Sequence, residues 1–210
     1  YGIVTTYNSW IGILSVIVGF ALHMSVRMAA VDYKDKLDDF MSSIILFVTL
    51  TSFGITAVVA SGIKLLHFDS NIVLVIICML QAYGSGTIED YSNYLMMKYE
   101  YKARTALMIL PNFISVVLSV YMIKYVLESD LYMGRIIPTA VVTIFFGLVT
   151  VCLTLKKGKF RINKEYIKYA MAISAPLILH GIALNILSQS DRIMITSLAG
   201  AAQTGIYSLI

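Results

Sequence analysis

Residues 135–155 read RIIPTAVVTIFFGLVTVCLTL, and this stretch decides the fold class. Its one charged side chain, Arg135, stands at the very start. An α-helix of about 20 apolar residues crosses the roughly 30 Å hydrocarbon core of a bilayer. The stretch lacks the regular alternation of apolar and polar residues that a membrane β-barrel strand would have. It therefore predicts a transmembrane helix.

Further apolar runs of similar length occur along the chain, separated by short polar connections. The predicted spans are Asn8–Ala30, Phe40–Ile63, Asn71–Met97, Thr105–Leu127, Arg135–Leu155 and Tyr169–Ser190, with another starting near Gln203. The 210 residues are 59% hydrophobic and 13% charged, a composition that favours lipid surroundings. Because backbone groups in lipid must be satisfied internally, helices are the expected structure. The sequence predicts an all-α, polytopic transmembrane helix bundle.

Lys and Arg are distributed unevenly between alternate connections. Twelve of the sixteen fall on one side of the predicted bundle: Arg27, Lys34, Lys36, Lys98, Lys102, Arg104, Lys156, Lys157, Lys159, Arg161, Lys164 and Lys168. The opposite side has Lys64, Lys124, Arg135 and Arg192. Because short cytoplasmic loops are rich in basic residues, we expect the first set in the cytoplasm and Tyr1–Tyr7 outside it, in a multi-pass cell (inner or plasma) membrane protein. This bias explains the net charge of +4, so no nucleic acid partner is expected.

The connection 156–168 is the longest and most basic, and it divides the chain into two predicted parts. Residues 1–155 are expected to form most of one bundle, 156–168 a cytoplasmic linker, and 169–210 the start of a second bundle. Gly2-Ile3 and Gly205-Ile206, 203 residues apart, favour two parallel repeats, a symmetry found in secondary transporters. The chain starts with Tyr1 and stops at Ile210 inside an apolar stretch, so we expect a fragment.

The first span carries polar and small residues at spacings of three and four, ending in His23 and Arg27. One interpretation is a seam for tight helix packing, with Arg27 reaching the cytoplasmic headgroups. The other places His23 and Arg27 in a cavity, where they attract an anionic lipid phosphate. The sequence leaves both open.

The third span has a polar density that a lipid-facing helix would not tolerate, so we expect it to face protein or water. Its acidic residues, Glu89 and Asp90, are adjacent and point about 100° apart on a helix. In one interpretation one carboxylate pairs with a neighbouring helix and the other approaches the cytoplasmic interface. In the other, a carboxylate shielded from water binds a coupling H⁺ or Na⁺.

The sixth span contains Pro176 and Gly181, a candidate hinge, although simple helix bending explains them equally well. Downstream, Asn185, Gln189 and Arg192 form one stripe, while His180 and Asp191 lie on another. The candidates for the substrate path are His180, Asn185, Gln189 and Arg192, whereas Asp191 is a candidate for ion coupling. A structural ion pair and hydrogen-bonded packing are the alternatives for the Asp191-Arg192 pair and for His180.

Several kinds of chemistry lack a supporting motif. No phosphate-binding Gly-rich loop with Lys-Ser/Thr occurs, and no His/Cys cluster has metal-ligand spacing, so we expect no metal and no cofactor beyond a coupling ion. Cys78 and Cys152 are interpreted as lone apolar side chains. The aspartates of the first basic connection are expected to form a solvated turn: Asp32, Asp35, Asp38 and Asp39.

Three stretches near the C-terminus carry a resemblance to a known family. They are Ala175-Pro176-Leu177-Ile178-Leu179-His180, Ser190-Asp191-Arg192-Ile193-Met194-Ile195 and Gly200-Ala201-Ala202-Gln203-Thr204-Gly205-Ile206-Tyr207-Ser208. In this order they resemble the signature of the polysaccharide (O-antigen and capsule repeat-unit, Wzx-type) flippases. Tyr1-Gly2-Ile3 likewise resembles the turn after that family's first helix. Glu89 and Asp90 match no motif of the family.

The resemblance implies the fold of the multidrug/oligosaccharidyl-lipid/polysaccharide (MOP) exporters, with two six-helix bundles around a central cavity. This chain would then run from the second helix to the start of the eighth. The implied function is transfer of an undecaprenyl-diphosphate-linked oligosaccharide to the outer leaflet by alternating access, driven by an ion gradient. Its implied partners are membrane lipid and polysaccharide assembly proteins, and its implied origin is bacterial or archaeal.

Two other functions remain open at this point. One is another MOP transporter, either a drug/cation antiporter or a peptidoglycan-precursor flippase. The other is a membrane-embedded enzyme, a polysaccharide polymerase or acyltransferase. The short extracytoplasmic loops disfavour the enzyme, so we expect a transporter.

Overall fold

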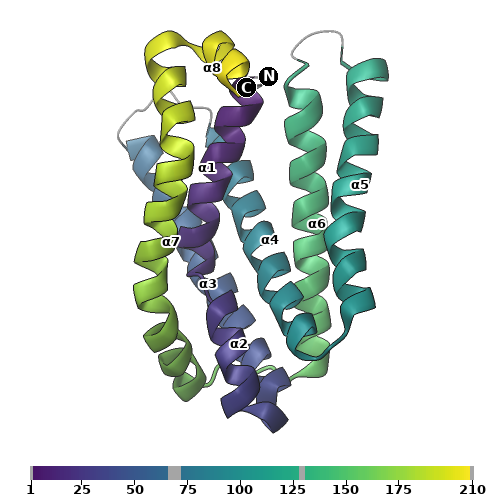
Figure 1. Cartoon of the computed structure of the whole chain (residues 1–210), viewed down its shortest axis with the longest axis vertical. Helices are drawn as coiled ribbons and strands as arrows, with labels where there is room; N and C mark the ends of the chain where they lie inside the picture. The colour runs from purple at the N-terminus through teal and green to yellow at the C-terminus, as the bar shows by residue number, and fades with distance from the viewer. Residues whose placement is uncertain (1, 66–71, 128–130, 209–210) are drawn as a thin grey trace.

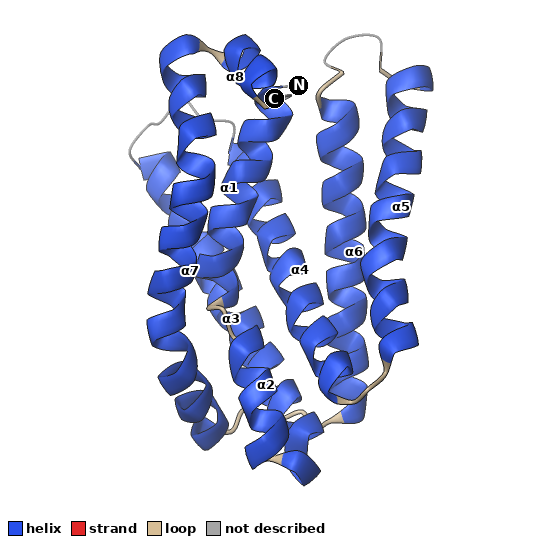
Figure 2. Ribbon diagram, viewed as in Figure 1, coloured by secondary structure: helices blue, strands red, loops and turns tan. Residues whose placement is uncertain are grey.

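The computed structural model describes residues 2–65, 72–127 and 131–208, which form helices joined by short connections (Figure 1 and Figure 2). The elements are α1 Gly2–Gly19, α2 His23–Asp32, the 3-10 turn η1 Lys34–Lys36, α3 Leu37–Leu65, α4 Ile72–Met97, α5 Tyr101–Tyr125, α6 Met133–Lys157, α7 Lys164–Ala199 and α8 Ala201–Tyr207. No strand occurs among the described residues. Six helical segments in this part of the chain are long and apolar enough to cross a membrane. The predicted all-α polytopic bundle is confirmed.

The helices run past the predicted spans at most of their ends. The largest difference is α7, which covers Lys164–Ala199 rather than 169–190 and so takes in the end of the predicted linker 156–168. α8 begins at Ala201, close to Gln203. Asn71, the first residue of the predicted third span, lies outside the described residues. Hydropathy marks only the part of a helix that lies in hydrocarbon, and polar turns can extend it into the interface.

The first predicted span, Asn8–Ala30, is not one continuous helix. α1 starts at Gly2, so Gly2-Ile3 belongs to a helix and not to a turn, and most of the segment expected outside the membrane is helical. Phe20 and Ala21 then adopt left-handed backbone, with φ of 52° and 47°, before α2 begins. Such a conformation costs roughly 1–3 kcal/mol for each non-glycine residue. Contacts from neighbouring helices must therefore hold this break.

α4 packs against α1, α2, α3, α5 and α6, and most of its polar side chains lie inside the bundle, Glu89 excepted. The buried ones are Gln81, Thr87, Asp90, Ser92 and Asn93. The Tyr7 hydroxyl of α1 donates a hydrogen bond to Gln81 Oε1 at 2.9 Å. Burial against protein removes these groups from lipid, as the sequence predicted for this span.

α4 and α6 come into backbone contact at two glycines. A Cβ built on Gly147 would lie 2.6 Å from the Cα of Gly84, and one on Gly84 would lie 2.8 Å from the carbonyl oxygen of Thr143. Small residues permit this kind of backbone contact between membrane helices. The glycine pair therefore sets the separation of α4 and α6.

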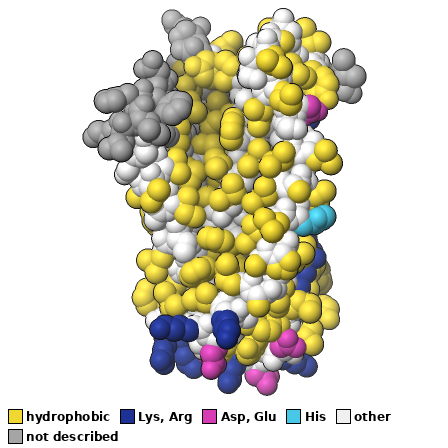
Figure 3. All heavy atoms as spheres, turned by 90° about the vertical axis from the view of Figure 1, so that its left-hand side faces the viewer, with side chains coloured by type: hydrophobic (Ala, Val, Ile, Leu, Met, Phe, Trp, Pro, Cys, Tyr) yellow, Lys and Arg dark blue, Asp and Glu magenta, His cyan; other side chains and the backbone are white. Residues whose placement is uncertain are grey.

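One end of the bundle, the basic end, contains η1, the α4–α5 connection and the α6–α7 connection. Lys, Arg, Asp and Glu gather at this end, while hydrophobic side chains cover most of the face above it (Figure 3). Ion pairs join the connections: Lys98–Asp38 (2.5 Å), Lys157–Glu100 (3.6 Å) and Lys159–Asp39 (3.1 Å). Asp38 and Asp39 thus bind other segments, and the expectation of a merely solvated turn is wrong for them.

Besides α4, α1 also packs against α7 and α8. The two Gly-Ile segments, at Gly2 and Gly205, meet where α1 contacts α8. A Cβ on Gly2 would lie 1.7 Å from the carbonyl oxygen of Ala201 and 3.0 Å from the amide nitrogen of Gly205. Thr6 Oγ1 lies 2.6 Å from Thr196 Oγ1, which lies 2.7 Å from Thr204 Oγ1. The start of α1 and the helix α8 are therefore in direct backbone contact, and Figure 1 shows the two side by side.

Candidate substrate path

His23 and Arg27 stand one turn apart on α2 and face α4. His23 Nε2 lies 3.8 Å from Glu89 Oε1, and Arg27 Nε donates a hydrogen bond to Asn93 Oδ1 at 2.8 Å. Asn93 Nδ2 in turn donates to the backbone oxygen of Glu89 at 2.9 Å. The Arg27 side chain is thus held against a neighbouring helix and remains exposed, instead of only extending toward headgroups.

A second arginine approaches the same part of α4 from α5. Arg104 Nε donates a hydrogen bond to Ser92 Oγ at 3.2 Å, directly beside Asn93 in sequence. In the sequence Arg104 counted only as a loop charge, because nothing there places the first turn of α5 against α4. Within the described residues, both arginines use Nε for these contacts, and their terminal nitrogens have no hydrogen bond or ion pair.

The adjacent carboxyl groups of α4 have different surroundings. The Glu89 side chain is 59% exposed and lies near His23, as described above. Asp90 is only 2% exposed, and its Oδ2 has no hydrogen-bond partner among the described residues. Both residues border a small cavity at the break between α1 and α2. The two candidates for ion coupling on α4 are therefore not equivalent.

The polar stripe of α7 packs against α1. Gln189 Oε1 accepts hydrogen bonds from Ser9 Oγ at 2.8 Å and from Arg192 Nη1 at 3.3 Å. A Cβ on Gly12 would lie 3.4 Å from Asn185 Oδ1. Asn185, Gln189 and Arg192 therefore lie together at a helix interface, away from the arginines that bind α4.

The remaining candidates on α7 lie apart from this interface. His180 is exposed, and Asp191 Oδ2 accepts a hydrogen bond from the Tyr207 hydroxyl of α8 at 2.6 Å. α7 runs unbroken through Pro176 and Gly181, and a Cβ on Gly181 would lie 3.2 Å from the Val16 side chain. A hinge at these residues stays a prediction.

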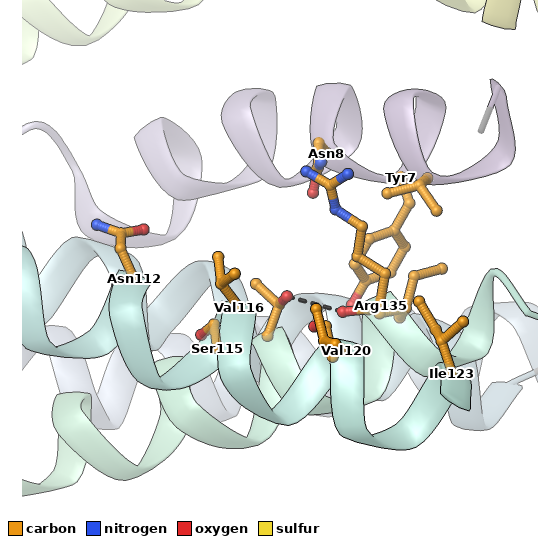
Figure 4. A pocket seen from close by; sticks show the side chains of 12 residues that line it. Tyr7, Asn8, Asn112, Ser115, Val116, Val120, Ile123 and Arg135 are labelled. Atoms are coloured by element: carbon orange, nitrogen blue, oxygen red, sulfur yellow. Dashed lines mark hydrogen bonds between the residues drawn. The ribbon is translucent and has the colours of Figure 1, made fainter. Parts of the chain in front are cut away.

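A groove of about 450 Å³ with both polar and aliphatic lining residues lies between α1, α5 and α6, toward the end opposite the basic end (Figure 4). Its polar lining residues are Tyr7, Asn8, Asn112, Ser115, Ser119, Arg135 and Thr139. Figure 4 shows the Arg135 side chain extending toward α1 near Asn8. Amides, hydroxyls and one guanidinium are groups that hydrogen-bond sugar hydroxyls and anionic oxygens.

Sequence reasoning missed this groove, although a signal for it exists. Asn112, Ser115 and Ser119 recur at spacings of three and four in an otherwise apolar run, which places them on one face of α5. Arg135 and Thr139 have the same relation on α6. What the sequence lacks is the arrangement that turns these faces toward each other and toward α1.

The chain was compared with known proteins. No curated protein and no solved structure matches it. A family model described as "Polysaccharide biosynthesis protein" matches residues 1–210, the whole chain. This match agrees with the resemblance carried by the motifs around Pro176, Asp191 and Gly205. The chain therefore belongs to the polysaccharide biosynthesis protein family, the family of Wzx-type flippases in the MOP superfamily.

Proposed function

We propose that this multi-pass membrane protein of polysaccharide biosynthesis is part of a flippase for lipid-linked oligosaccharides. Its substrate would be an undecaprenyl-diphosphate-linked repeat unit for O-antigen, capsule or exopolysaccharide. The protein would move this unit from the inner to the outer leaflet by alternating access of two bundles. In this proposal the basic end is cytoplasmic, which agrees with the usual excess of Lys and Arg on that side.

One observation carries the proposal: Arg27 and Arg104 hold their Nε atoms on α4 and leave their terminal nitrogens available. An arginine fork matches the geometry of phosphate oxygens and can bind them through two parallel hydrogen bonds. A diphosphate cannot enter hydrocarbon without such compensation. The two side chains therefore supply a cationic entry for the headgroup at the basic end.

The groove beside Arg135 supports the later part of the same path. Its hydroxyl and amide lining suits an oligosaccharide, which needs many hydrogen bonds and little charge. The polyprenyl tail would remain in lipid beside the bundle. We further propose that an ion gradient, of H⁺ or Na⁺, drives the cycle. The two arginines at the basic end and the groove beside Arg135 suit the binding and passage of a substrate, which favours a transporter over an enzyme.

Transport of a defined lipid-linked oligosaccharide by the full-length protein in proteoliposomes tests the proposal. We expect Arg27→Ala and Arg104→Ala each to lower the rate about 10- to 100-fold, since a charge-assisted hydrogen bond contributes about 1.5–3 kcal/mol. Lys34→Ala is the matched control, because it removes an exposed positive charge from η1 at the same end. Arg27→Lys should recover part of the rate.

Some results would contradict this proposal. Normal transport by both Arg27→Ala and Arg104→Ala at normal expression would refute the proposal that these arginines form a cationic entry for the headgroup. Transport of a cationic drug, with none of the lipid-linked oligosaccharide, would assign the protein to the antiporter branch instead.

A further inference from the structure

A cavity of about 30 Å³ lies at the break of the first span, where α1, α2 and α4 meet. The residues that matter for its chemistry are Ser15, Gly19, Ala21, His23, Glu89 and Asp90. One water molecule takes up roughly 10–15 Å³ of such space. The cavity therefore has room for two or three water-sized groups and none for a sugar or a diphosphate.

Asp90 makes this cavity a favourable place for a positive charge. The side chain is 2% exposed, and its Oδ2 has no hydrogen-bond partner in the part of the chain that the structure describes. The neighbouring Glu89 carboxylate adds further negative charge. An ionised carboxylate that is buried without a partner costs several kcal/mol. A proton or a bound cation at Asp90 removes this cost.

The basic side chains around the cavity make their described contacts with groups other than Asp90. His23, on α2, lines the cavity and lies 3.8 Å from Glu89, and Arg27 binds Asn93 through Nε. α1 contributes no charged residue, and the basic residues of α6 stand at its two ends. Among the described residues, therefore, no side chain forms an ion pair with Asp90.

The break itself supplies the other ligands that a cation needs. α1 ends at Gly19, whose carbonyl oxygen accepts one hydrogen bond, from the Leu22 amide at 3.2 Å, and keeps a second lone pair at the partially negative end of the helix. Gly19 and Ala21 border the cavity, and Ser15 adds a hydroxyl oxygen. Unwound carbonyls next to a carboxylate are the arrangement that binds coupling cations in secondary transporters.

We propose that Asp90, Ser15 and the backbone of the broken turn bind one small monovalent cation, H⁺ or Na⁺. The site also adjoins the second part of the chain, because Ser174 Oγ of α7 donates a hydrogen bond to the Ala21 carbonyl oxygen at 3.4 Å. Its occupation is thus linked to the contact between α7 and the broken span. The inference rests on the proposed transport only for its biological purpose.

Infrared difference spectroscopy of the full-length protein in lipid tests the site without any transported substrate. One arm raises the buffer from about pH 6 to about pH 9, a range that brackets most shifted carboxyl groups, with choline as the only added cation. The other arm replaces choline by Na⁺ at constant pH. We expect the C=O stretching band of a protonated, buried carboxyl group to decrease in the first arm if H⁺ is the ligand. A decrease in the second arm as well identifies Na⁺ as a ligand that displaces the proton.

Two variants assign the band. Asp90→Asn should abolish the change, while Glu89→Gln, a matched removal of the adjacent carboxyl group, should retain it. If Asp90→Asn does not fold, the band change in the wild type and its retention in Glu89→Gln still test the inference. No band change in either arm, persistence of the change in Asp90→Asn, or its loss in Glu89→Gln would overturn the inference. Failed oligosaccharide transport with an intact band change would refute the flippase proposal and leave the cation site standing.

Discussion

The contact between α4 and α6 gives the sharpest prediction about the stability of the bundle. In Gly147→Ala the new methyl carbon would lie 2.6 Å from the Cα of Gly84 and 3.1 Å from Thr87 Oγ1. Carbon atoms pack best at about 3.5–4.0 Å, so the two helices must separate by roughly 1 Å. Such a gap forfeits a quarter to a half of the dispersion energy of each contact that it opens.

The expected cost follows from two opposing effects. Overpacking a well-packed interface costs about 1–3 kcal/mol, whereas alanine in place of glycine within a helix gains up to about 1 kcal/mol. Gly54→Ala and Gly62→Ala on α3 are matched controls, because no described atom lies within 4 Å of a Cβ at either position. Because the gain from alanine is common to the variant and the controls, we expect Gly147→Ala to be less stable than these controls by the overpacking cost, about 1–3 kcal/mol.

Equilibrium unfolding of the purified protein in mixed micelles, by titration with a denaturing detergent, measures these differences. Gly84→Ala should be destabilised as well, because its Cβ would lie 2.8 Å from the Thr143 carbonyl oxygen. The loss of unfolding free energy in the double variant should be smaller than the sum of the losses in the two single variants, since each substitution forces the same separation of α4 and α6. If Gly147→Ala and Gly84→Ala unfold at the same detergent fraction as Gly54→Ala, the close crossing of α4 and α6 is refuted.

Three further predictions concern single contacts. Gly2→Val should separate α1 from α8, lowering the thermal midpoint and increasing proteolysis near residue 200, because its Cβ would collide with the Ala201 carbonyl oxygen; unchanged cleavage would argue against this contact. Tyr94→Phe removes a 2.7 Å hydrogen bond to Asp38 and should cost about 1–2 kcal/mol in detergent unfolding, with Tyr99→Phe, at an exposed position, as the control. Ser119→Leu should fill the groove and slow oligosaccharide transport in proteoliposomes, whereas Ser119→Ala should transport normally; equal rates for both would exclude the groove from the path.

Part of the candidate site could be predicted from the sequence because it depends on local spacing. His23 and Arg27 are one turn apart, so their common face followed from helix geometry. Helix geometry did not predict which of Glu89 and Asp90 is buried, since either carboxyl group could have faced the protein interior. Which carboxyl group faces the cavity depends on how α4 is rotated against α1 and α2, and that rotation is set by packing along the whole helix.

The positions of the helices follow from the apolar runs in the amino-acid sequence. A polypeptide in hydrocarbon must satisfy its backbone groups within the segment, so a long apolar run leaves no other structure. Pro111, Pro138 and Pro176 lie inside α5, α6 and α7 without ending them. In the part of the chain that the structure describes, the one break within a span instead falls at Phe20 and Ala21, which carry no helix-breaking signal.

Three features depend instead on how the helices pack: the position of that break, the crossing at Gly84 and Gly147, and the anchoring of Arg27 and Arg104 on α4. The crossing and the two arginine anchors join residues that are far apart in sequence, and the break is a backbone conformation that is unfavourable in isolation. Their free energies come from contacts between helices, which hydropathy does not encode because lipid tails and apolar side chains solvate a helix almost equally well.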